Sequence, residues 1–492
     1  MSTQLTANSN KTTKKFIFFV IGIVIILACG LLLPVTEGGL TEGGRWCFGI
    51  FLSTVFLWIT CDIGWPTLLA MSLIPMTGIY SAAQIFQISI GSTSVLFSAT
   101  VTMFNLALTQ CGVTERIAYW FLTRKSAKGK PWNFMFLFFL SALVIGYFMD
   151  CVPVTIIYIG LIDAIHKALG MEKGTSFGKA LAFGSLVIIQ CGYMGSPVAH
   201  VAPLLMIGVI ESTTGIAVSV PKYLMIGIPL TLIVLVLTYL VIRFVMRPDV
   251  SALANYDAEA ERAKLKPLGK DAKIILVVFA LTVACWLFPD LLGGVFPGVA
   301  AFLTKISINI PPLLGIVALC LIKSSEGDRP ILNFSEACKN CSWDVLIFIG
   351  GVLMFSGVVG NDATGIKAFL VGLVSPVSTV LPPFALAAAG LLFGVIVTSF
   401  MSNIVTQTIV YTVVGTLFIA NPGFGMSAVA YGVLTTMLCN LAILTPAGTP
   451  AAAFIYRSGY MNTSEPWKPG FILILAVWVI AIPFLFLANV LL

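Results

Sequence analysis

Ionisable residues are rare inside the apolar segments of this chain, and the exception is a candidate for chemistry. Asp150, in 148–153 (FMDCVP), lies at the centre of the apolar segment 132–165, where the only other charged residue is Asp163 near the end. A carboxyl group at such a depth is unfavourable unless it has a role, and it is by default a candidate functional site. Asp150 therefore predicts a place for a proton, a cation or a cationic group. Its structural alternative is a cap on the helix that follows.

A second polar motif repeats the first one 252 residues later. Residues 400–407 (FMSNIVTQ) align with 148–155 (FMDCVPVT), and 448–450 (GTP) align with 195–197 (GSP) at a spacing of 253. Two motif pairs in the same order indicate an internal repeat. Because an odd number of predicted spans separates the copies, they are expected to be inverted relative to each other, which is typical of secondary transporters.

The composition places these motifs in a lipid bilayer. Of 492 residues, 59% are hydrophobic and 10% are charged, whereas a soluble domain carries roughly 25% charged residues. The net charge of +7 is scattered over short loops, which argues against nucleic-acid binding. The pair Cys338 and Cys341 (CKNC) has metal-type spacing, but no second pair or nearby histidine completes a site. We therefore predict no metal centre.

Lysine and arginine clusters predict the topology, because they mark the cytosolic side. The apolar run 16–34 has no cleavage site after it and is expected to be the first span rather than a signal peptide. The positions of the clusters predict a cytosolic N-terminus, about eleven spans, an external C-terminus and a multi-pass protein of the cell (plasma) membrane. The clusters are 124–130, 167–179, 243–273, 323–339 and 457–468.

Two segments are better explained as re-entrant hairpins than as single helices. As one helix, 132–165 would be about 51 Å long, against a hydrocarbon core of about 30 Å, and positive clusters flank both of its ends. A hairpin that turns at Asp150 to Pro153 resolves both conflicts. Residues 368–456 contain no Asp, Glu, Lys or Arg. They leave room for a matching hairpin with its tip at Ser402-Asn403 and a span interrupted at Pro446 to Pro450.

Broken helices inside a bilayer predict a binding site. Half-helix N-termini carry partial positive charge and attract anions, and unwound carbonyl groups can hold a small cation. The alternative is that the proline and glycine residues are simple kinks, which are common in membrane helices. Paired breaks beside paired tips favour a site for a carboxylate-bearing solute and a coupling ion.

These motifs resemble the divalent anion/sodium symporter (DASS) family. The similarity is carried by 400–403 (FMSN), 448–450 (GTP) and 458–460 (SGY), and it runs from about residue 16 to the C-terminus, including 112–122 and 343–351. Members are sodium-coupled carriers or exchangers of di- and tricarboxylates and sulfate. The resemblance implies a homodimer in which a transport part moves against a scaffold in an elevator-like motion.

The family pattern also implies site residues. In the family, Asn and Thr of a Ser-Asn-Thr tip bind substrate carboxylates, and the tips and breaks frame two sodium sites. By position, the implied substrate-binding residues are Asp150, Cys151, Val152, Ser196, Pro197, Asn403, Ile404, Thr449 and Pro450. The implied ion-coupling residues are Asp150, Gly195, Ser402, Asn403 and Gly448, with Na⁺ as the coupling ion.

The first tip departs from the family pattern. Asp150, Cys151 and Val152 replace Ser-Asn-Thr, and Ile404 replaces the threonine of the second tip. At the breaks, alanines replace the asparagines, at Ala199 and Ala452. A carboxylate at Asp150 would repel a dianion unless it is protonated, binds the coupling cation, or meets a monoanionic or zwitterionic solute. His200 is a possible proton partner if it faces Asp150, although a lone histidine in a membrane more often serves packing.

The sequence predicts an all-α polytopic membrane protein with two inverted repeats, each with a re-entrant hairpin and a broken helix. We expect a secondary active transporter of di- or tricarboxylate-like anions, coupled to sodium or protons or working as an exchanger. The alternative is a carrier of a monocarboxylate or zwitterionic amino-acid-like solute that uses Asp150. An intramembrane enzyme and a channel are less favoured hypotheses. The sequence contains no P-loop motif, which argues against direct use of ATP.

The expected organisation places a transport part and scaffold helices in each repeat. Side chains outside the transport parts are expected at interfaces, with Lys305 and Glu211 at external helix ends and Tyr456 and Arg457 as interfacial anchors. The expected segments are an N-terminal tail (1–15), scaffold helices (16–92), a transport part (93–210, with hairpin 132–165 and broken helix 180–208), a scaffold helix (211–246), a cytosolic linker (247–272), scaffold helices (273–342), a second transport part (343–460, with hairpin 380–418 and broken helix 426–456) and a final span (461–492).

Overall fold

The structure is a computed structural model of the chain that describes all residues except 1, 38, 266, 307–308, 371 and 373–380. The described residues form helices and no β-strand, apart from one isolated bridge between Lys323 and Pro330. Among the described residues, nine helices are long and apolar enough to cross a membrane, or up to eleven if each of two bent pairs is one span. The predicted all-helical polytopic fold is therefore confirmed, with nine to eleven candidate spans where about eleven were expected.

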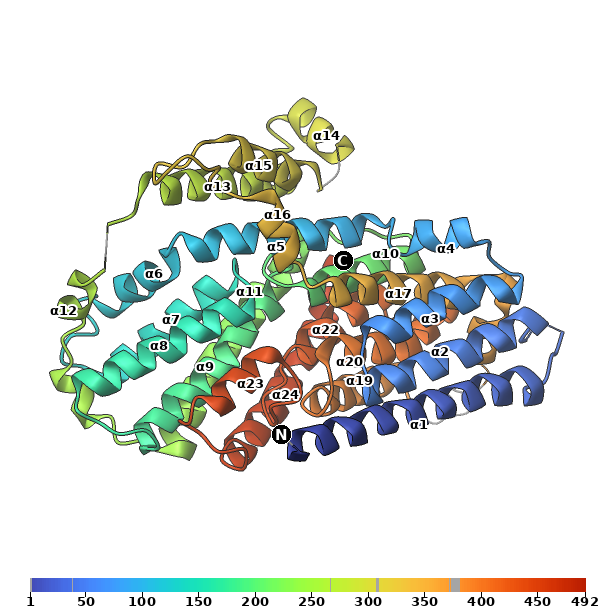
Figure 1. Cartoon of the computed structure of the whole chain (residues 1–492), viewed down its shortest axis with the longest axis horizontal. Helices are drawn as coiled ribbons and strands as arrows, with labels where there is room; N and C mark the ends of the chain where they lie inside the picture. Colours follow the sequence, from blue (N-terminus) through green and yellow to red (C-terminus); the bar gives the residue numbers. More distant parts are fainter. Residues whose placement is uncertain (1, 38, 266, 307–308, 371, 373–380) are drawn as a thin grey trace.

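In the first half of the chain, eleven α-helices of the described residues precede the hydrophilic linker, and Figure 1 shows how they are arranged. Their bounds are α1 (Ser2–Leu32), α2 (Glu42–Thr60), α3 (Gly64–Leu73), α4 (Ala82–Ile88), α5 (Thr93–Gln110), α6 (Val113–Leu122), α7 (Pro131–Gly146), α8 (Cys151–Ala168), α9 (Ser176–Gly195), α10 (Val201–Thr214) and α11 (Val220–Val241). The linker contains the short helix α12 (Ala258–Ala263). The expected N-terminal tail is helical, because α1 begins at Ser2.

The second half follows the same plan. The helices described there are α13 (Lys270–Leu292), α14 (Pro297–Lys305), α15 (Ile310–Leu321), α16 (Phe334–Asn340), α17 (Trp343–Gly360), α19 (Pro383–Val397), α20 (Asn403–Val410), α21 (Thr416–Ala420), α22 (Ala428–Cys439), α23 (Pro450–Arg457) and α24 (Trp467–Leu491). The wider π-helical turn η5 (Tyr411–Gly415) joins α20 to α21. In Figure 1, α13, α14 and α15 form a layer above α5, and α13, α15 and α16 contact α5.

The internal repeat is visible in the helix boundaries. Three successive helices of the first half begin 252 residues before their counterparts in the second half: α7 and α19 at Pro131 and Pro383, α8 and α20 at Cys151 and Asn403, and α9 and α22 at Ser176 and Ala428. The residue before each tip helix is its N-cap, Asp150 in one copy and Ser402 in the other. The spacing of the sequence motifs thus corresponds to equivalent structural positions.

The helices are interrupted where the sequence predicts, with shifted boundaries. The first turn comprises Tyr147 to Asp150 rather than Asp150 to Pro153, because Pro153 lies in the first turn of α8, where its missing N–H is harmless. The second tip lies between α19 and α20. Residue 380, the expected start of the second hairpin, lies outside the described residues. The second break begins at Asn440 rather than Pro446 and extends to Thr449.

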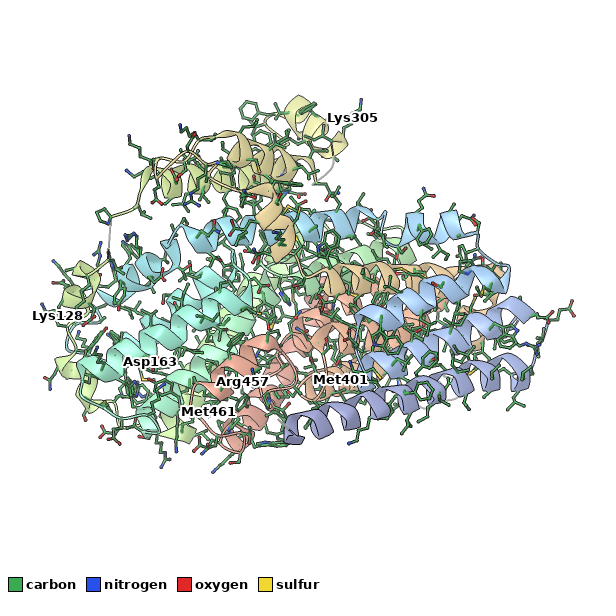
Figure 2. The ribbon with its side chains drawn as sticks, viewed as in Figure 1. Lys128, Asp163, Lys305, Met401, Arg457 and Met461 are labelled. Atoms are coloured by element: carbon green, nitrogen blue, oxygen red, sulfur yellow. The ribbon has the colours of Figure 1, made fainter. Side chains whose placement is uncertain are left out.

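Polar contacts join the base of the first hairpin to the end of the second broken helix. Tyr460 Oη donates to Asp163 Oδ1 at 2.6 Å, and Lys173 Nζ lies 3.1 Å from the same oxygen. Lys173 also donates to the carbonyl of Ser458 at 3.0 Å. Figure 2 labels Asp163 and Met461 in the lower left part of the view. These contacts connect the two repeats at the base of the first hairpin.

The ion pair of Lys179 with Glu465, 2.6 Å apart, makes stability depend on pH. Partial burial opposes ionisation of Glu465, but Lys179 and the N–H of Asn462 outweigh it and lower the pKa of this carboxyl group. A lowered pKa stabilises the fold above the unfolded-state value, about 4.3 for Glu, and this contribution is lost as the pH falls through the folded-state pKa. We expect Glu465→Gln to cost less than about 1 kcal/mol at neutral pH.

The thermal unfolding midpoint in detergent, followed against pH, checks this expectation. The wild-type advantage over Glu465→Gln should shrink below about pH 5. Glu326, which is exposed and lies 3.7 Å from Arg329, is the matched control, and Glu326→Gln should follow the wild-type curve. A constant gap between wild type and Glu465→Gln at every pH would contradict the ionic explanation.

Candidate functional site

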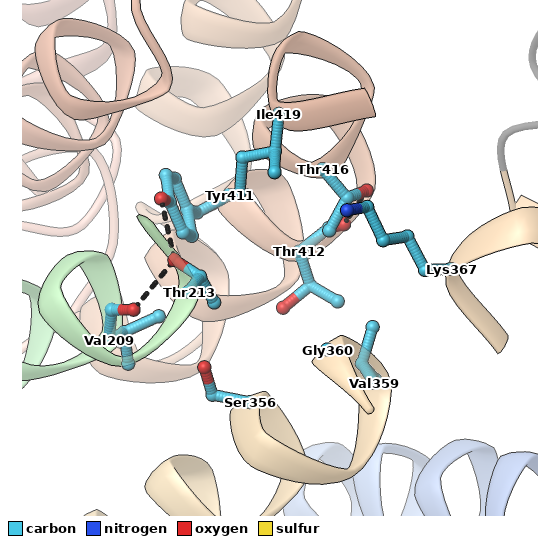
Figure 3. A pocket seen from close by; sticks show the side chains of 10 residues that line it. All are labelled: Val209, Thr213, Ser356, Val359, Gly360, Lys367, Tyr411, Thr412, Thr416 and Ile419. Carbon is cyan, nitrogen blue, oxygen red and sulfur yellow. Dashed lines mark hydrogen bonds between the residues drawn. The ribbon is translucent and has the colours of Figure 1, made fainter. Parts of the chain in front are cut away.

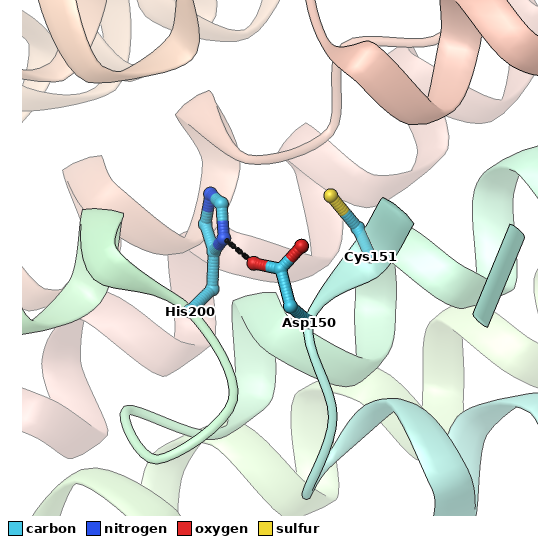
Figure 4. Close-up of side chains that lie close together, drawn as sticks. All are labelled: Asp150, Cys151 and His200. Atoms are coloured by element: carbon cyan, nitrogen blue, oxygen red, sulfur yellow. Dashed lines mark hydrogen bonds and ion pairs between the residues drawn. The ribbon is translucent and has the colours of Figure 1, made fainter. Parts of the chain in front are cut away.

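The first hairpin tip holds a carboxylate–imidazole pair. Asp150 Oδ2 lies 2.9 Å from Nδ1 of His200 (Figure 4). The other oxygen of Asp150 accepts the N–H of Val152 at 3.1 Å and so caps α8, and the backbone N–H of Asp150 donates to Asn105 Oδ1 at 3.3 Å. The capping role and the pairing with His200 therefore coexist, one on each carboxylate oxygen.

The break between α9 and α10 places His200 opposite this tip. His200 is the N-cap of α10 in extended conformation and makes no side-chain capping bond, so its ring is free to face Asp150. The ring of Tyr193 packs against it with centroids 4.5 Å apart. The side chains of His200 and Asp150 are 14% and 28% exposed. The pair is thus held in place but is not sealed from an approaching proton or solute.

Three side chains at the first tip have the chemistry of cation ligands. Asp150, Cys151 and His200 each offer one ligand atom, and these atoms lie within 4.8 Å of one another. A carboxylate, a thiol and an imidazole suit a borderline-soft cation such as Zn²⁺ better than Na⁺, which prefers oxygen. No other such group of three occurs among the described residues. The arrangement can hold a proton between two of its members without any metal.

The second hairpin tip is built from amide groups. Asn403 Nδ2 donates to Asn440 Oδ1 at 2.6 Å, and Asn403 Oδ1 accepts the N–H of Ile404 at 2.9 Å. Asn440 in turn donates to the carbonyl of Thr436 at 2.7 Å. Ser402 is the N-cap of α20 but makes no side-chain capping bond. A neutral amide and a hydroxyl therefore lie at the positive end of α20, where an anion is favoured.

The second break is fastened to the second tip. Thr398 donates to the carbonyl of Cys439, and Thr445 donates to the carbonyl of Ser399. Gly448 packs directly on the tip, because a Cβ atom there would lie 2.7 Å from the carbonyl oxygen of Thr398. These contacts explain why α22 ends at Cys439, and they require glycine at position 448.

The same break also reaches the first tip. Cys151 lies against the backbone of Ala451, and Tyr193 lies beside Thr449. Thr449 caps α23 by accepting the N–H of Ala452 at 3.2 Å. The segment Gly448 to Ala451 is therefore in contact with both hairpin tips.

Two buried glutamines cross-link the repeats. Gln190 of α9 donates to the carbonyl of Ala442 at 2.9 Å and accepts its N–H at 2.8 Å. Gln407 of α20 donates to the carbonyl of Ala202, just after the first break, at 2.8 Å. Each broken helix is thus held by the opposite repeat, and Gln190 satisfies backbone groups of Ala442 that no helix pairs.

The structure places the sequence-predicted residues as follows. Asp150, Cys151, His200 and Thr449 come together around the first tip, and Ser402, Asn403 and Gly448 come together around the second. Gly195 packs between Tyr147 and Thr231 and has no side chain to offer. Ser196 accepts the N–H of Val198, and Pro450 is exposed at the start of α23. Pro197 and Ile404 are buried, and Val152 is partly buried.

Four residues that contribute to this region were not predicted from the sequence. Gln190, Gln407 and Asn440 are buried amides in apolar segments, a signal that polarity alone could have flagged. Tyr193 is fully buried, and its hydroxyl has no hydrogen-bond partner among the described residues. Tyr456, expected to be an interfacial anchor, instead donates to the carbonyls of Ile443 and Leu444 at 3.1 Å.

Comparison with known proteins relates the chain to membrane transporters. Residues 11–490 match the family described as the sodium:sulfate symporter transmembrane region. The sodium-dependent dicarboxylate transporter SdcS of Staphylococcus saprophyticus is 23% identical over 448 residues, which are 86% of this chain and 83% of that protein. SdcS of Staphylococcus aureus strain USA300 is 24% identical over 450 residues, covering 86% and 82%. A crystal structure of the Alcanivorax borkumensis YdaH transporter overlaps with a TM-score of 0.49 at 15% identity, covering 83% of this chain and 86% of that chain.

The family match extends over nearly the whole sequence and includes both tips and both breaks. The family and the relatives are transporters and not enzymes, so the expectation of a non-enzymatic protein is confirmed. The chain is a multi-pass membrane protein that belongs to the sodium:sulfate symporter family, the divalent anion/sodium symporters that its tips and breaks resemble.

Proposed function

We propose that the chain is a secondary active carrier of small di- or tricarboxylate-like anions that couples transport to a proton at its first tip and to sodium at its second. The observation that carries this proposal is the 2.9 Å contact between Asp150 and His200. The names of the SdcS relatives, sodium-dependent dicarboxylate transporters, support the class of substrate and of coupling ion. An elevator-like motion, a homodimer, a cytosolic N-terminus and an external C-terminus complete the proposal.

The second tip is the proposed carboxylate and sodium site. Asn403 presents an amide at the N-terminus of α20, and Ser402 keeps its hydroxyl out of the helix cap. The break at Gly448 and Thr449 supplies a second helix N-terminus, that of α23. Backbone N–H groups at such ends favour the substrate carboxylate, whereas carbonyl and hydroxyl oxygens of unwound segments suit Na⁺.

The first tip is the proposed proton site. A lone carboxylate would repel a dianion, but one proton shared by Asp150 and His200 makes the pair electrically neutral, with a neutral acid beside an imidazole or a carboxylate beside an imidazolium. The pair thus replaces the neutral Ser-Asn-Thr tip that the family resemblance implies. The relatives named as dicarboxylate transporters favour a carboxylate anion over a zwitterion as the solute.

A ligand screen and a counterflow assay test the proposal. Purified protein is heated with mono-, di- and tricarboxylates and amino acids, with and without sodium, at two pH values. A di- or tricarboxylate at about 100 times its Kd should stabilise the fold by about 2.7 kcal/mol, and proteoliposomes should show saturable uptake and counterflow of that compound. Stabilisation by amino acids alone would move the assignment to a zwitterion carrier, and flux without saturation or counterflow would indicate a channel.

A further inference from the structure

A separate polar cavity lies beyond the second tip, between the ends of α10 and α17 and the π-helical turn η5 (Figure 3). Tyr411, which lines the cavity, lies eight residues after Asn403. At the helical rise per residue this is about 12 Å further along the second half of the second hairpin. The cavity volume is about 40 Å³, room for about three water molecules or one small anionic group, but not for a whole dicarboxylate. Its polar lining consists of Thr213, Ser356, Lys367, Tyr411, Thr412 and Thr416.

Most hydroxyl protons around this cavity are already committed. Thr213 donates to the carbonyl of Val209 at 2.8 Å, so Tyr411, 3.0 Å away, is the donor in its bond to Thr213. Ser212 donates to the same carbonyl at 2.9 Å, so Ser356 is the donor in its bond to Ser212. Thr416 donates to the carbonyl of Thr412 at 2.7 Å. These groups form a fixed polar frame, because a hydroxyl has one proton to give.

Lys367 is the charged donor of this cavity. Its ammonium group reaches across the cavity toward Thr416 (Figure 3). No carboxylate within the described part of the chain lies within ion-pair distance of it, and residues 368–456 contain none at all. The hydroxyl of Thr412 also points into the cavity and makes no hydrogen bond as a donor among the described residues. One positive charge and one hydroxyl are thus available to a ligand.

We propose that this cavity binds a single small anionic group, held by Lys367 and Thr412, as an external station on the path to the second tip. The Lys and Arg clusters predict that α10 and α17 both end on the external side, and the two helix ends meet at this cavity. The occupant is either one carboxylate group of the solute or a free halide ion, which share charge and size. The role on the path rests on the proposed function, whereas the binding of an anion does not.

The first arm of the test measures halide binding without any carboxylate. The unfolding midpoint of purified protein is followed while chloride replaces gluconate at constant ionic strength. A halide occupant predicts a saturable rise in wild type that is absent in Lys367→Gln and Thr412→Val and retained in Lys367→Arg. The result of this first arm can be interpreted even if the protein transports no carboxylate.

The second arm measures uptake from the outside in chloride-free buffer. A solute carboxylate as occupant predicts that Lys367→Gln raises KM by about two- to fivefold with kcat unchanged, the size expected of one partly exposed charge contact. Lys222→Gln removes one positive charge from the same predicted side and is the matched control, with unchanged KM. Wild-type behaviour of Lys367→Gln and Thr412→Val in both arms would overturn the proposed site. A wild-type protein without counterflow would overturn the proposed function alone.

Discussion

Asn403→Ala is expected to reduce carboxylate uptake to the background of empty liposomes. Asn403 is 5% exposed, and its two side-chain polar atoms bond to Asn440 Oδ1 and to the N–H of Ile404. In the proposed site this amide is also the neutral donor that meets the substrate carboxylate. A hydrogen bond to a charged group contributes about 1.5–3 kcal/mol, which is roughly 10- to 150-fold in affinity, and the loss of tip geometry adds to it.

The experiment compares counterflow of the best-stabilising carboxylate in wild type, Asn403→Ala and Asn421→Ala. Asn421, at the end of α21, also bonds one side-chain amide to a helix carbonyl, that of Leu417 at 3.0 Å, but it lies 18 positions beyond the tip. Asn421→Ala should transport normally. Because Asn403→Ala leaves buried groups unpaired, its unfolding midpoint is recorded first. Unaltered kinetics in Asn403→Ala would remove the second tip from the site.

The repeat and both tips could be predicted because their polar motifs interrupt long apolar segments and recur at a nearly constant spacing. Asp150 and Ser402-Asn403 are such interruptions, and the structure places them at equivalent N-caps. The start of the second break could not be predicted, because contacts from other segments end α22. Gln190 pairs with the backbone of Ala442, and Thr398 binds the carbonyl of Cys439.

The composition of the site was harder to predict than its location. Tyr193 has no distinctive neighbours in the sequence, and only the fold shows that its ring packs on His200 and its hydroxyl lies beside Thr449. Ser196 and Pro197 align with Thr449 and Pro450, yet only Thr449 is brought beside Tyr193, whose ring packs on His200. At the first break the residue that contacts the tip is His200, the N-cap of α10, five residues after Gly195. Equivalent positions in a repeat therefore need not have equivalent roles.

Asp150→Asn is expected to remove the pH dependence of uptake while leaving the protein folded. Asparagine is as good an N-cap as aspartate, and its oxygen can still accept the N–H of Val152. It cannot share a proton with His200. For a carrier that moves a proton with the solute, wild-type uptake should rise as the external pH falls from about 8 to 5. The Asp150→Asn profile should be flat.

Asp163→Asn is the matched control, since Asp163 lies on the same helix α8 but at its other end, bound to Lys173 and Tyr460. This variant should keep the pH profile of wild type. His200→Gln should flatten the profile as Asp150→Asn does, and the double variant should resemble either single one, because residues that act as one unit do not add. Additive effects would mean that Asp150 and His200 act separately. An unchanged pH profile in Asp150→Asn would mean that Asp150 serves only as the N-cap of α8. Sodium at the second tip would then be the only proposed coupling ion.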